Sequence, residues 1–199
     1  MVGVRIPLSK ETIRSFIAVE IGSQIIDQIS AFQKSLVDTG ANLKLVETKN
    51  VHITMRFLGE LPVSLVNRIG VELKNVPFKP FTMSLQGTGV FPNMRRINVV
   101  WVGLKKGIME LEDIHSQIES GLKRVGIRSD DEAFSPHITV ARVRSAHNKD
   151  KLVKFLFSVR NKYFGSLSMD SVKLKKSVLT PKGPIYTTMV EVRAIKNSL

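Results

Sequence analysis

The spacing of apolar side chains predicts a chain that alternates between strands and helices. Segments with the alternation and β-branched composition of strands lie at 14–20, 50–57, 81–90, 96–103, 137–144 and 162–195, with a turn at 181–184 inside the last. Between several of them, apolar residues recur every three or four positions, as on one face of an α-helix. The pattern therefore predicts the α+β fold class.

Four helices fit the second kind of spacing. The first would run from Ser23 to Gly40, the second would begin at Pro62, the third would span 107–125 and the fourth would follow Asn148. Ser23 and Asn148 are good helix N-cap residues, and a glycine can take the left-handed backbone that ends a helix. The apolar positions expected to face the core are Ile25, Ile29, Phe32, Leu36, Leu65, Ile69, Leu73, Ile108, Leu111, Ile114, Ile118, Leu122 and Val125.

The chain also repeats itself. The segments FIAVE (16–20) and VHITM (51–55), with a helix between them, correspond to VVWVG (99–103) and PHITV (136–140), again with a helix between them. Two strand–helix–strand units of one plan would pack about a pseudo-twofold axis. We therefore expect two pseudo-symmetric lobes around a central cleft that holds both HIT triplets.

Composition narrows the class of protein. The 199 residues include no cysteine, which excludes disulfides, thiolate nucleophiles and cysteine-bound zinc. A hydrophobic content of 43% is typical of a packed globular chain, and we expect residues 1–199 to form a single domain. No apolar run approaches the roughly 18 residues of a membrane span, so we expect a soluble, cytoplasmic protein with no membrane partner.

The chain is strongly basic, with 30 Lys and Arg against 17 Asp and Glu and a net charge of +13. Such an excess favours a polyanionic partner, although a solubilising surface or a hot habitat would also account for it. Arg95, Arg96, Arg142, Arg144 and Lys182 adjoin segments that the repeat brings toward the cleft. A basic rim there would attract a nucleic-acid backbone.

Two of the four histidines, His52 and His137, begin the same triplet. Residues i and i+2 share a face of a strand, so each imidazole would lie beside a threonine hydroxyl, from Thr54 or Thr139, while the isoleucine between them faces the core. Imidazole can take or give a proton near neutral pH, so two of them flanking one phosphorus can act as base and acid. The hydroxyls can donate to phosphate oxygens.

A metal-dependent hydrolase fits this pattern less well. Zinc and magnesium sites in hydrolases usually have three or more His, Asp or Glu ligands, whereas neither triplet has a carboxylate within two positions of its histidine. The Gly-x-Ser-x-Gly nucleophile motif is also missing from the sequence. We therefore expect a reaction that needs no metal and no cofactor.

These motifs resemble those of the 2H phosphoesterase superfamily, and within it the bacterial and archaeal RNA 2′,3′-cyclic phosphodiesterases, also called 2′-5′ RNA ligases. The resemblance extends over nearly the whole chain and is carried in order by FIAVEI, VHITMRFLGE, the FP of GVFPNMRR, VVWVGL, SPHITVARV and SVLTPKGPIYTTM. It implies a bilobal α+β fold with a V-shaped, mostly antiparallel sheet region and with both His-x-Thr-x tetrads lining the cleft between the lobes. Residues 1–12 precede the usual start of the family.

Carried over residue by residue, the resemblance implies that His52 is the general acid and His137 the general base in hydrolysis of an RNA 2′,3′-cyclic phosphate end to a 2′-phosphate. Thr54, Thr139 and Arg142 would bind the phosphate, with a guanidinium able to donate two hydrogen bonds. The same site could run in reverse as an ATP-independent 2′-5′ RNA ligase. The expected partner is RNA with a 2′,3′-cyclic phosphate terminus, such as a tRNA fragment, and a monomer is expected.

Two other functions remain open from the residues alone. The His-x-Thr pairs could bind a phosphate without turnover, which would make the protein an RNA-binding module. Alternatively, a 2H phosphodiesterase with these motifs could act on 2′-5′ oligonucleotides or on small cyclic nucleotides. Hydrolysis of a defined substrate, compared between the intact protein and histidine variants, would separate these classes.

Several neighbours of the motifs have two interpretations each. Arg56 could lie beside the phosphate or be a solvated charge. Phe57 and Phe134 could stack on a base, but aromatic residues on strands are more often core. Trp101 is better interpreted as packing in the second lobe, and Tyr186 is a candidate to reach the cleft.

Overall fold

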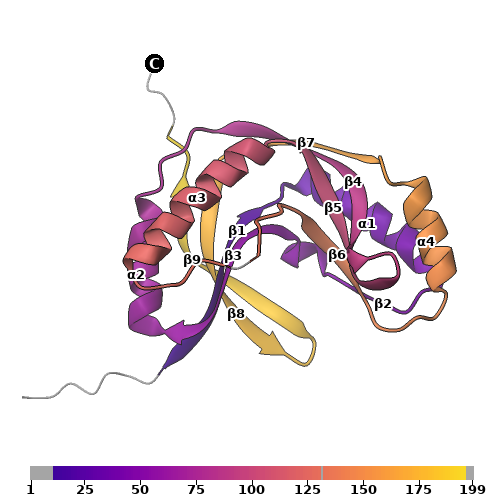
Figure 1. The fold of residues 1–199 in the computed structure, drawn as a ribbon, viewed down its shortest axis with the longest axis horizontal. Helices are drawn as coiled ribbons and strands as arrows, with labels where there is room; N and C mark the ends of the chain where they lie inside the picture. Colours follow the sequence, from indigo (N-terminus) through magenta and orange to yellow (C-terminus); the bar gives the residue numbers. More distant parts are fainter. Residues whose placement is uncertain (1–10, 131, 196–199) are drawn as a thin grey trace, which may run out of the picture.

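A single antiparallel sheet runs through the computed structural model, which describes residues 11–130 and 132–195. In these residues nine strands were found: β1 (Thr12–Glu20), β2 (Leu43–Leu45), β3 (His52–Pro62), β4 (Phe81–Asn93), β5 (Arg96–Lys106), β6 (Ile138–Val143), β7 (Tyr163–Met169), β8 (Ser171–Thr180) and β9 (Gly183–Arg193). The helices of the same residues are α1 (Ser23–Asp38), α2 (Val63–Lys74), α3 (Ile108–Arg124) and α4 (Lys149–Ser158), with a 3-10 turn at Thr48–Asn50. The predicted α+β class is confirmed (Figure 1).

The order of the strands is symmetric about the middle of the sheet. It runs β7-β4-β5-β6-β3-β1-β8-β9, with β2 paired to β6, and every recorded strand pair is antiparallel. The repeat units occupy matching places, since β1 pairs with β3 and β5 pairs with β6. The two halves meet where Ile53 pairs with Ile138, the central residues of the two HIT triplets. This arrangement is the pseudo-twofold duplication expected from the sequence.

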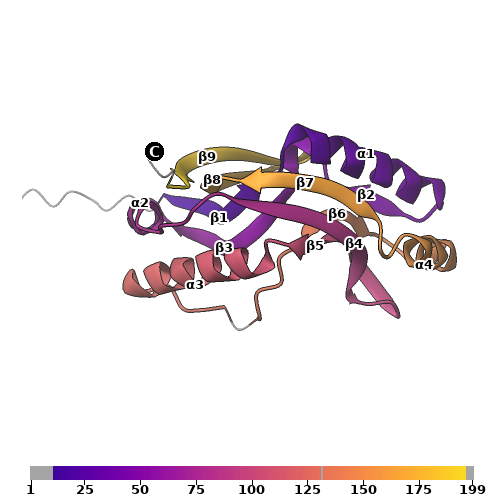
Figure 2. The same ribbon diagram turned by 90° about the horizontal axis from the view of Figure 1, so that it is seen from above.

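The helices cover the two ends of the sheet differently. Helix α1, which follows β1 and precedes β2, packs against β7 and β6 of the other half. Helix α3, which joins β5 to β6, contacts β5 and packs beside α2, which also contacts β1, β3 and β9. Figure 2 shows α1 and α3 on opposite sides of the sheet. Each half is therefore held to the other by a crossing helix, which favours a fixed geometry at the junction.

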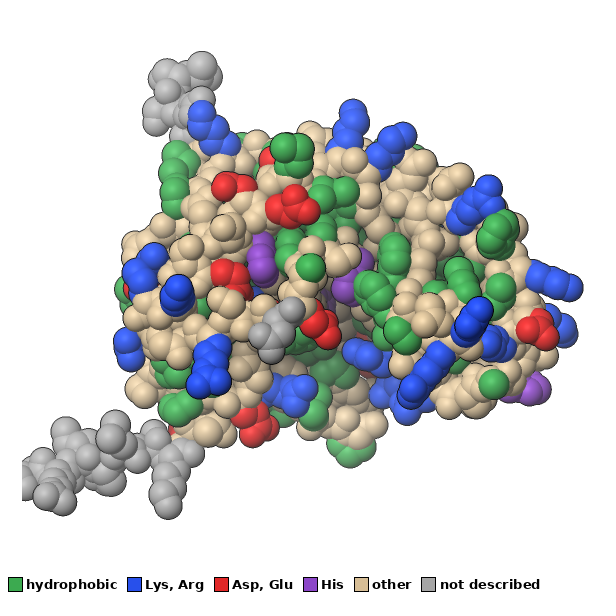
Figure 3. All heavy atoms as spheres, viewed as in Figure 1, with side chains coloured by type: hydrophobic (Ala, Val, Ile, Leu, Met, Phe, Trp, Pro, Cys, Tyr) green, Lys and Arg blue, Asp and Glu red, His purple; other side chains and the backbone are tan. Residues whose placement is uncertain are grey.

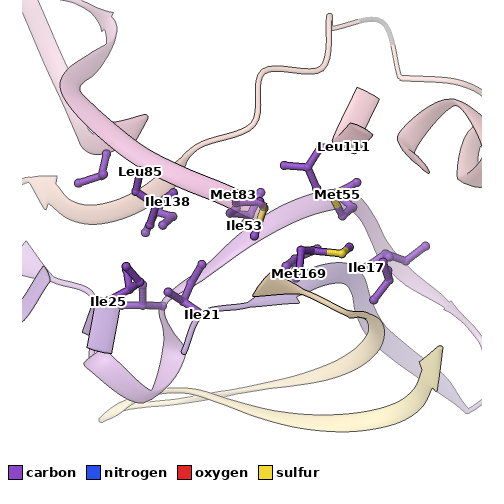
Figure 4. Close-up of a cluster of buried hydrophobic side chains, with 14 of the residues drawn as sticks. Ile17, Ile21, Ile25, Ile53, Met55, Met83, Leu85, Leu111, Ile138 and Met169 are labelled. Carbon is purple, nitrogen blue, oxygen red and sulfur yellow. The ribbon is translucent and has the colours of Figure 1, made fainter. Parts of the chain in front are cut away.

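The hydrophobic core lies between the sheet and these helices. Ile53 and Ile138 are both 0% exposed, and Figure 4 shows them among other buried side chains. Burying an isoleucine stabilises a fold by about 1.5–3 kcal/mol, so each triplet is anchored by its central residue. Because neighbouring residues on a strand point to opposite faces, the flanking histidine and threonine then face away from the core.

The structure corrects several local expectations. β3 continues to Pro62 rather than ending at residue 57, and β6 begins at Ile138, so His137 precedes its strand. Gly22, not Ser23, is the N-cap residue of α1, and no side chain caps that helix.

Asn148 does occupy the N-cap of α4, as predicted, but its side chain makes no capping bond. Its backbone is left-handed (φ 51°), and its amide donates to the Gly40 carbonyl instead. The three-residue strand β2 was not predicted because it is too short to show a period. Of the segment 1–12, only Glu11 and Thr12 are among the described residues.

No helix in the described part of the chain is both long enough and apolar enough to cross a membrane.

Candidate active site

A cleft of about 600 Å³ opens where the two halves of the sheet meet. The sequence-predicted site residues all line it: His52, Thr54, His137, Thr139 and Arg142. Because Ile53 pairs with Ile138 in an antiparallel register, the two histidines come from opposite directions to the same junction. Two triplets separated by 85 residues in the sequence are thus brought to one place.

The two imidazoles are oriented by the same device. Nδ1 of His52 lies 2.7 Å from the carbonyl oxygen of Asn50, and Nδ1 of His137 lies 2.7 Å from that of Ser135, in each case two residues earlier. A carbonyl can only accept, so Nδ1 carries the proton and donates. In the neutral ring the free lone pair is then on Nε2. Each histidine therefore has one nitrogen fixed to the backbone and the other available for proton transfer.

Aromatic rings flank both imidazoles. His52 lies 5.0 Å from Phe16 and 5.6 Å from Tyr186, measured between ring centroids. His137 lies 4.9 Å from Phe91 and 6.2 Å from Trp101 on the same measure. Such contacts restrict rotation of the imidazole about its χ angles, so the backbone bond and the packing act together.

The electrostatic surroundings of His52 favour its neutral form. Burial is the largest cause that lowers the pKa of His52; the Asn50 carbonyl acts against this, and the charge of Lys175 adds to it. Glu20, which pairs with His52 across β1 and β3, is bound by Lys173 (2.5 Å) and by Lys175. Burial acts to raise the pKa of Glu20, but hydrogen bonds from these two lysines more than offset it, and the pKa is lowered. His52 thus has beside it a carboxylate bound by two lysines, not a lone carboxylate.

Arg142 reaches the cleft because β6 contains an irregularity. The pairing with β5 passes from Trp101↔Thr139 to Val100↔Ala141, which leaves Val140 as an extra residue. A bulge of this kind shifts the alternation of side chains by one position. Val140 and Ala141 are both buried, and Arg142 returns to the face that carries Thr139.

A matching bulge in β3 exposes Phe57. The pairing with β1 passes from Ala18↔Thr54 to Ile17↔Arg56, leaving Met55 as the extra residue. Phe57 therefore occupies the position in the first half that Arg142 has in the second, five residues after the histidine. It is 67% exposed and lines the cleft, so the interpretation of Phe57 as a core residue was wrong.

Arg56 lies on the other side of the sheet from the cleft. It is 9% exposed and binds Glu119 of α3 at 3.0 Å, Asp130, and the Arg128 carbonyl at 2.7 Å. Neither interpretation from the sequence, a phosphate contact or a solvated charge, is correct. The bulge is the physical reason, because it places residues 55 and 56 together on the buried face.

Other aromatic expectations have mixed outcomes. Tyr186 reaches the cleft. Phe134 stacks instead on His115, with centroids 4.1 Å apart and planes at 6°, and takes no part in the cleft lining. Trp101 packs in the second half, where Gly89 leaves room for its ring, but it also flanks His137, which the sequence did not predict.

Basic residues dominate the charged lining of the cleft. Arg14, Lys44, Arg142, Arg144 and Lys182 line it, against a single acid, Glu47. Arg142, Arg144 and Lys182 were predicted, whereas Arg95 and Arg96 are exposed but outside the lining. Lys44 was missed because it lies on the short strand β2, opposite Arg142. Figure 3 shows Lys and Arg side chains gathered on the side of the molecule that carries α4.

No group of three or more His, Asp or Glu side chains in the described residues is arranged to hold a metal ion.

The chain is similar to known proteins of one family. The family model described as LigT-like phosphoesterase matches twice in succession, to residues 19–101 and to residues 102–186. Each match contains one of the two HIT triplets, at 52–54 and at 137–139. The family model thus covers well over half of the chain.

Curated relatives are similar over most of their length. An RNA 2′,3′-cyclic phosphodiesterase of Aeropyrum pernix is 38% identical over 170 residues, which are 85% of this chain and 97% of that protein. One of Methanothermobacter thermautotrophicus is 35% identical over 179 residues, 89% of this chain and 96% of that protein.

Solved structures share the fold. E. coli LigT complexed with 3′-AMP superposes with a TM-score of 0.76 at 23% identity, covering 94% of this chain and 100% of that one. A Thermus thermophilus protein gives a TM-score of 0.76 at 25% identity, covering 90% of this chain and 97% of that one.

Proposed function

The chain belongs to the LigT-like phosphoesterases of the 2H superfamily, and from this premise we propose that it hydrolyses the 2′,3′-cyclic phosphate at the end of an RNA, the activity named for its relatives. The observation that carries the proposal is the shared cleft, in which two similarly oriented imidazoles and two threonine hydroxyls line one space. A basic rim around that space suits a polyanionic substrate.

The reaction needs one proton acceptor and one proton donor. In the proposed direction, Nε2 of neutral His137 takes a proton from water as its oxygen attacks phosphorus, and Nε2 of protonated His52 gives a proton to the departing O3′. The P–O3′ bond breaks, and the products are a 2′-phosphate and a free 3′-hydroxyl. The negative charge of a bound phosphodiester opposes the effect of burial on the pKa of His52 and favours the protonated form that an acid requires.

The remaining site residues would bind the phosphate. Thr54 and Thr139 offer hydroxyl donors from the two strands, and Arg142 offers a guanidinium that can donate two hydrogen bonds to one phosphate. These donors would offset the charge that develops on the phosphoryl oxygens in the transition state. Every step uses side chains alone, so we propose that the reaction is independent of metal.

The same groups can also join two RNA ends. If the 5′-hydroxyl of an RNA replaces water as the nucleophile, His137 takes its proton, His52 again protonates the departing O3′, and a 2′-5′ linkage forms without ATP; in cleavage of that linkage the two imidazoles exchange roles. Because water is present at a far higher concentration than RNA ends, hydrolysis should dominate. We propose ligation as a minor activity of the same site.

The decisive experiment is incubation of the protein with an oligonucleotide that ends in a 2′,3′-cyclic phosphate. We expect a product that keeps its phosphate on the 2′-hydroxyl, with equal rates in the presence and absence of EDTA. A 3′-phosphate product would contradict the assignment of the leaving oxygen. Loss of activity in EDTA that a divalent metal restores would contradict the two-histidine mechanism. Binding of the oligonucleotide without turnover would contradict the proposed hydrolysis and favour the alternative of a non-catalytic RNA-binding module.

A further inference from the structure

Tyr186 lies on the wall of the cleft beside His52, yet it belongs to neither strand–helix–strand unit. It is on β9, where it pairs with Ser177 of β8. Its ring meets the His52 ring edge-on, at 5.6 Å and 86°, and the Phe16 ring at 4.7 Å and 68°. A phenylalanine would make the same ring contacts. The hydroxyl therefore calls for a separate explanation.

The residue that orients His52 also fixes the strand of Tyr186. Asn50 is 7% exposed; its carbonyl accepts the bond from Nδ1 of His52, and its side-chain amide donates to the carbonyl of Pro184 at 3.0 Å. Pro184 lies two residues before Tyr186, and both line the cleft. One buried residue, through its backbone carbonyl and its side-chain amide, thus holds the imidazole and the strand of the phenol in a fixed relation, as substrate-binding groups require.

The surroundings keep the phenol in its hydrogen-bond-donating form. Burial raises the pKa of Tyr186, while the charges of Arg142 and Arg14 act in the opposite direction. Both guanidinium groups line the same cleft as the phenol. A neutral hydroxyl among cations is a donor available to an anion placed between them.

We propose that the hydroxyl of Tyr186 binds the substrate, by donating a hydrogen bond to a phosphate oxygen on the His52 side of the cleft. This inference rests on the proposed function, because it takes the phosphate to lie between the two imidazoles. It adds a third segment of chain, β9, to the two triplets that line the site. The hairpin of β8 and β9 would then be part of the binding site as well as an edge of the sheet.

The second tyrosine of the chain provides a matched control. Tyr163 is on β7 and is exposed, and its hydroxyl lies 2.8 Å from Oγ of Ser166. We expect Tyr186→Phe to lower kcat/KM on a cyclic-phosphate oligonucleotide by about 10- to 100-fold, the scale of a hydrogen bond to a charged group, and Tyr163→Phe to leave it unchanged. A Tyr186→Phe variant within twofold of the wild-type kcat/KM would overturn the proposal.

A titration separates substrate contact from a purely structural role. In the Tyr163→Phe variant Tyr186 is the one remaining tyrosine, so the phenolate absorbance reports its ionisation alone. An anion that accepts its hydrogen bond favours the protonated phenol, so saturating inorganic phosphate should raise the pKa of Tyr186 further. Phosphate that binds, as seen from the His52 NMR resonance, without moving this titration would contradict the contact.

Two further results keep the alternatives apart. The His52 resonance should titrate alike in the wild type and in Tyr186→Phe, because the ring that supports the imidazole is retained; a changed titration would mean that the hydroxyl acts by positioning His52. If the wild-type protein hydrolyses no cyclic phosphate, the proposed function fails, while the phosphate titration of Tyr186 still tests the binding site.

Discussion

His52 and His137 occupy equivalent places in the two halves of the sheet. Each donates Nδ1–H to the carbonyl two residues earlier, and each lies between two aromatic rings. The side chains around these shared features differ. His52 has the Tyr186 phenol, Glu20 and Lys175 for neighbours, whereas the rings next to His137 are those of Phe91 and Trp101.

The contrast continues along the two strands beyond the bulges. The residue five positions after the histidine lines the cleft in both halves, but it is Phe57 after His52 and Arg142 after His137. The residue four positions after the histidine is buried in both halves, but it is Arg56 in the first and Ala141 in the second. Duplication of a backbone plan thus supplies two oriented imidazoles, and divergence of the side chains gives them different surroundings. Different surroundings are what an acid and a base acting at one pH require.

The largest effect is expected from removing either imidazole. His52→Ala and His137→Ala should each lower kcat by roughly 10²-fold or more, the usual scale for acid–base groups, with much smaller changes in RNA affinity. His147→Ala is the matched control, since His147 is exposed and is not among the residues that line the cleft. Single-turnover rates measure the effect; if one alanine variant kept wild-type turnover, only the other half would carry the chemistry.

The buried guanidinium of Arg56 should contribute mainly to the stability of the fold. Arg56→Met removes the guanidinium partner of the largely buried Glu119 and leaves that carboxylate with the His115 imidazole at 3.8 Å, so we expect the free energy of unfolding to fall by about 3 kcal/mol. Arg124→Met, which removes the exposed pair with Glu72, should cost less than about 1 kcal/mol. Urea denaturation of both variants tests the difference, and equal losses would show that burial of the Arg56 pair has no energetic consequence.

The equivalent positions Phe57 and Arg142 should differ in what they contribute. Arg142→Met removes a guanidinium from the phosphate site and should lower kcat/KM by about 10- to 100-fold, with a weaker dependence on salt. Phe57→Leu keeps an apolar side chain and should lower it by less than about 10-fold. Steady-state kinetics of both variants at two salt concentrations test this difference. A larger loss of kcat/KM in Phe57→Leu than in Arg142→Met would contradict the assignment of Arg142 to the phosphate.

A smaller effect is expected in the titration of His52. Its folded-state pKa is below the ordinary 6.5, so protonation favours the unfolded chain. The stability that its neutral form contributes is present above pH 6.5 and is lost as the pH falls from there through the folded-state pKa. NMR of the imidazole should show a midpoint below 6.5, and Lys175→Met should move it upward by removing a nearby cation. A midpoint at or above 6.5 in the free protein would contradict the influence of burial.

Local patterns were enough to predict the elements and the repeat. Sequence patterns located the starts of the four helices in the described residues to within about one residue, and alternation placed Ile53 and Ile138 in the core with the histidines and threonines on the other face. The family could also be predicted, because two rare triplets in matching contexts are a long and specific pattern. The roles of the site residues stay predictions until turnover is measured.

The bulges, by contrast, could not be predicted, because an extra residue in one strand is defined only by its partner strand. Alternation alone would put Arg142 on the face opposite Thr139, and it would put Arg56 on the face of Thr54. The tertiary pairing reverses both placements.

What the sequence by itself determined is the chemistry of each strand: which residues pair an imidazole with a hydroxyl, and that this happens twice. Periodicity carries this information because it depends on neighbours a few positions away. What only the tertiary structure decided is which distant groups join them, such as Lys44 from β2, Arg14 from β1 and the bond from the Asn50 side chain to the Pro184 carbonyl. Those contacts depend on strand order and register, which arise from packing of the whole chain and leave no short-range pattern.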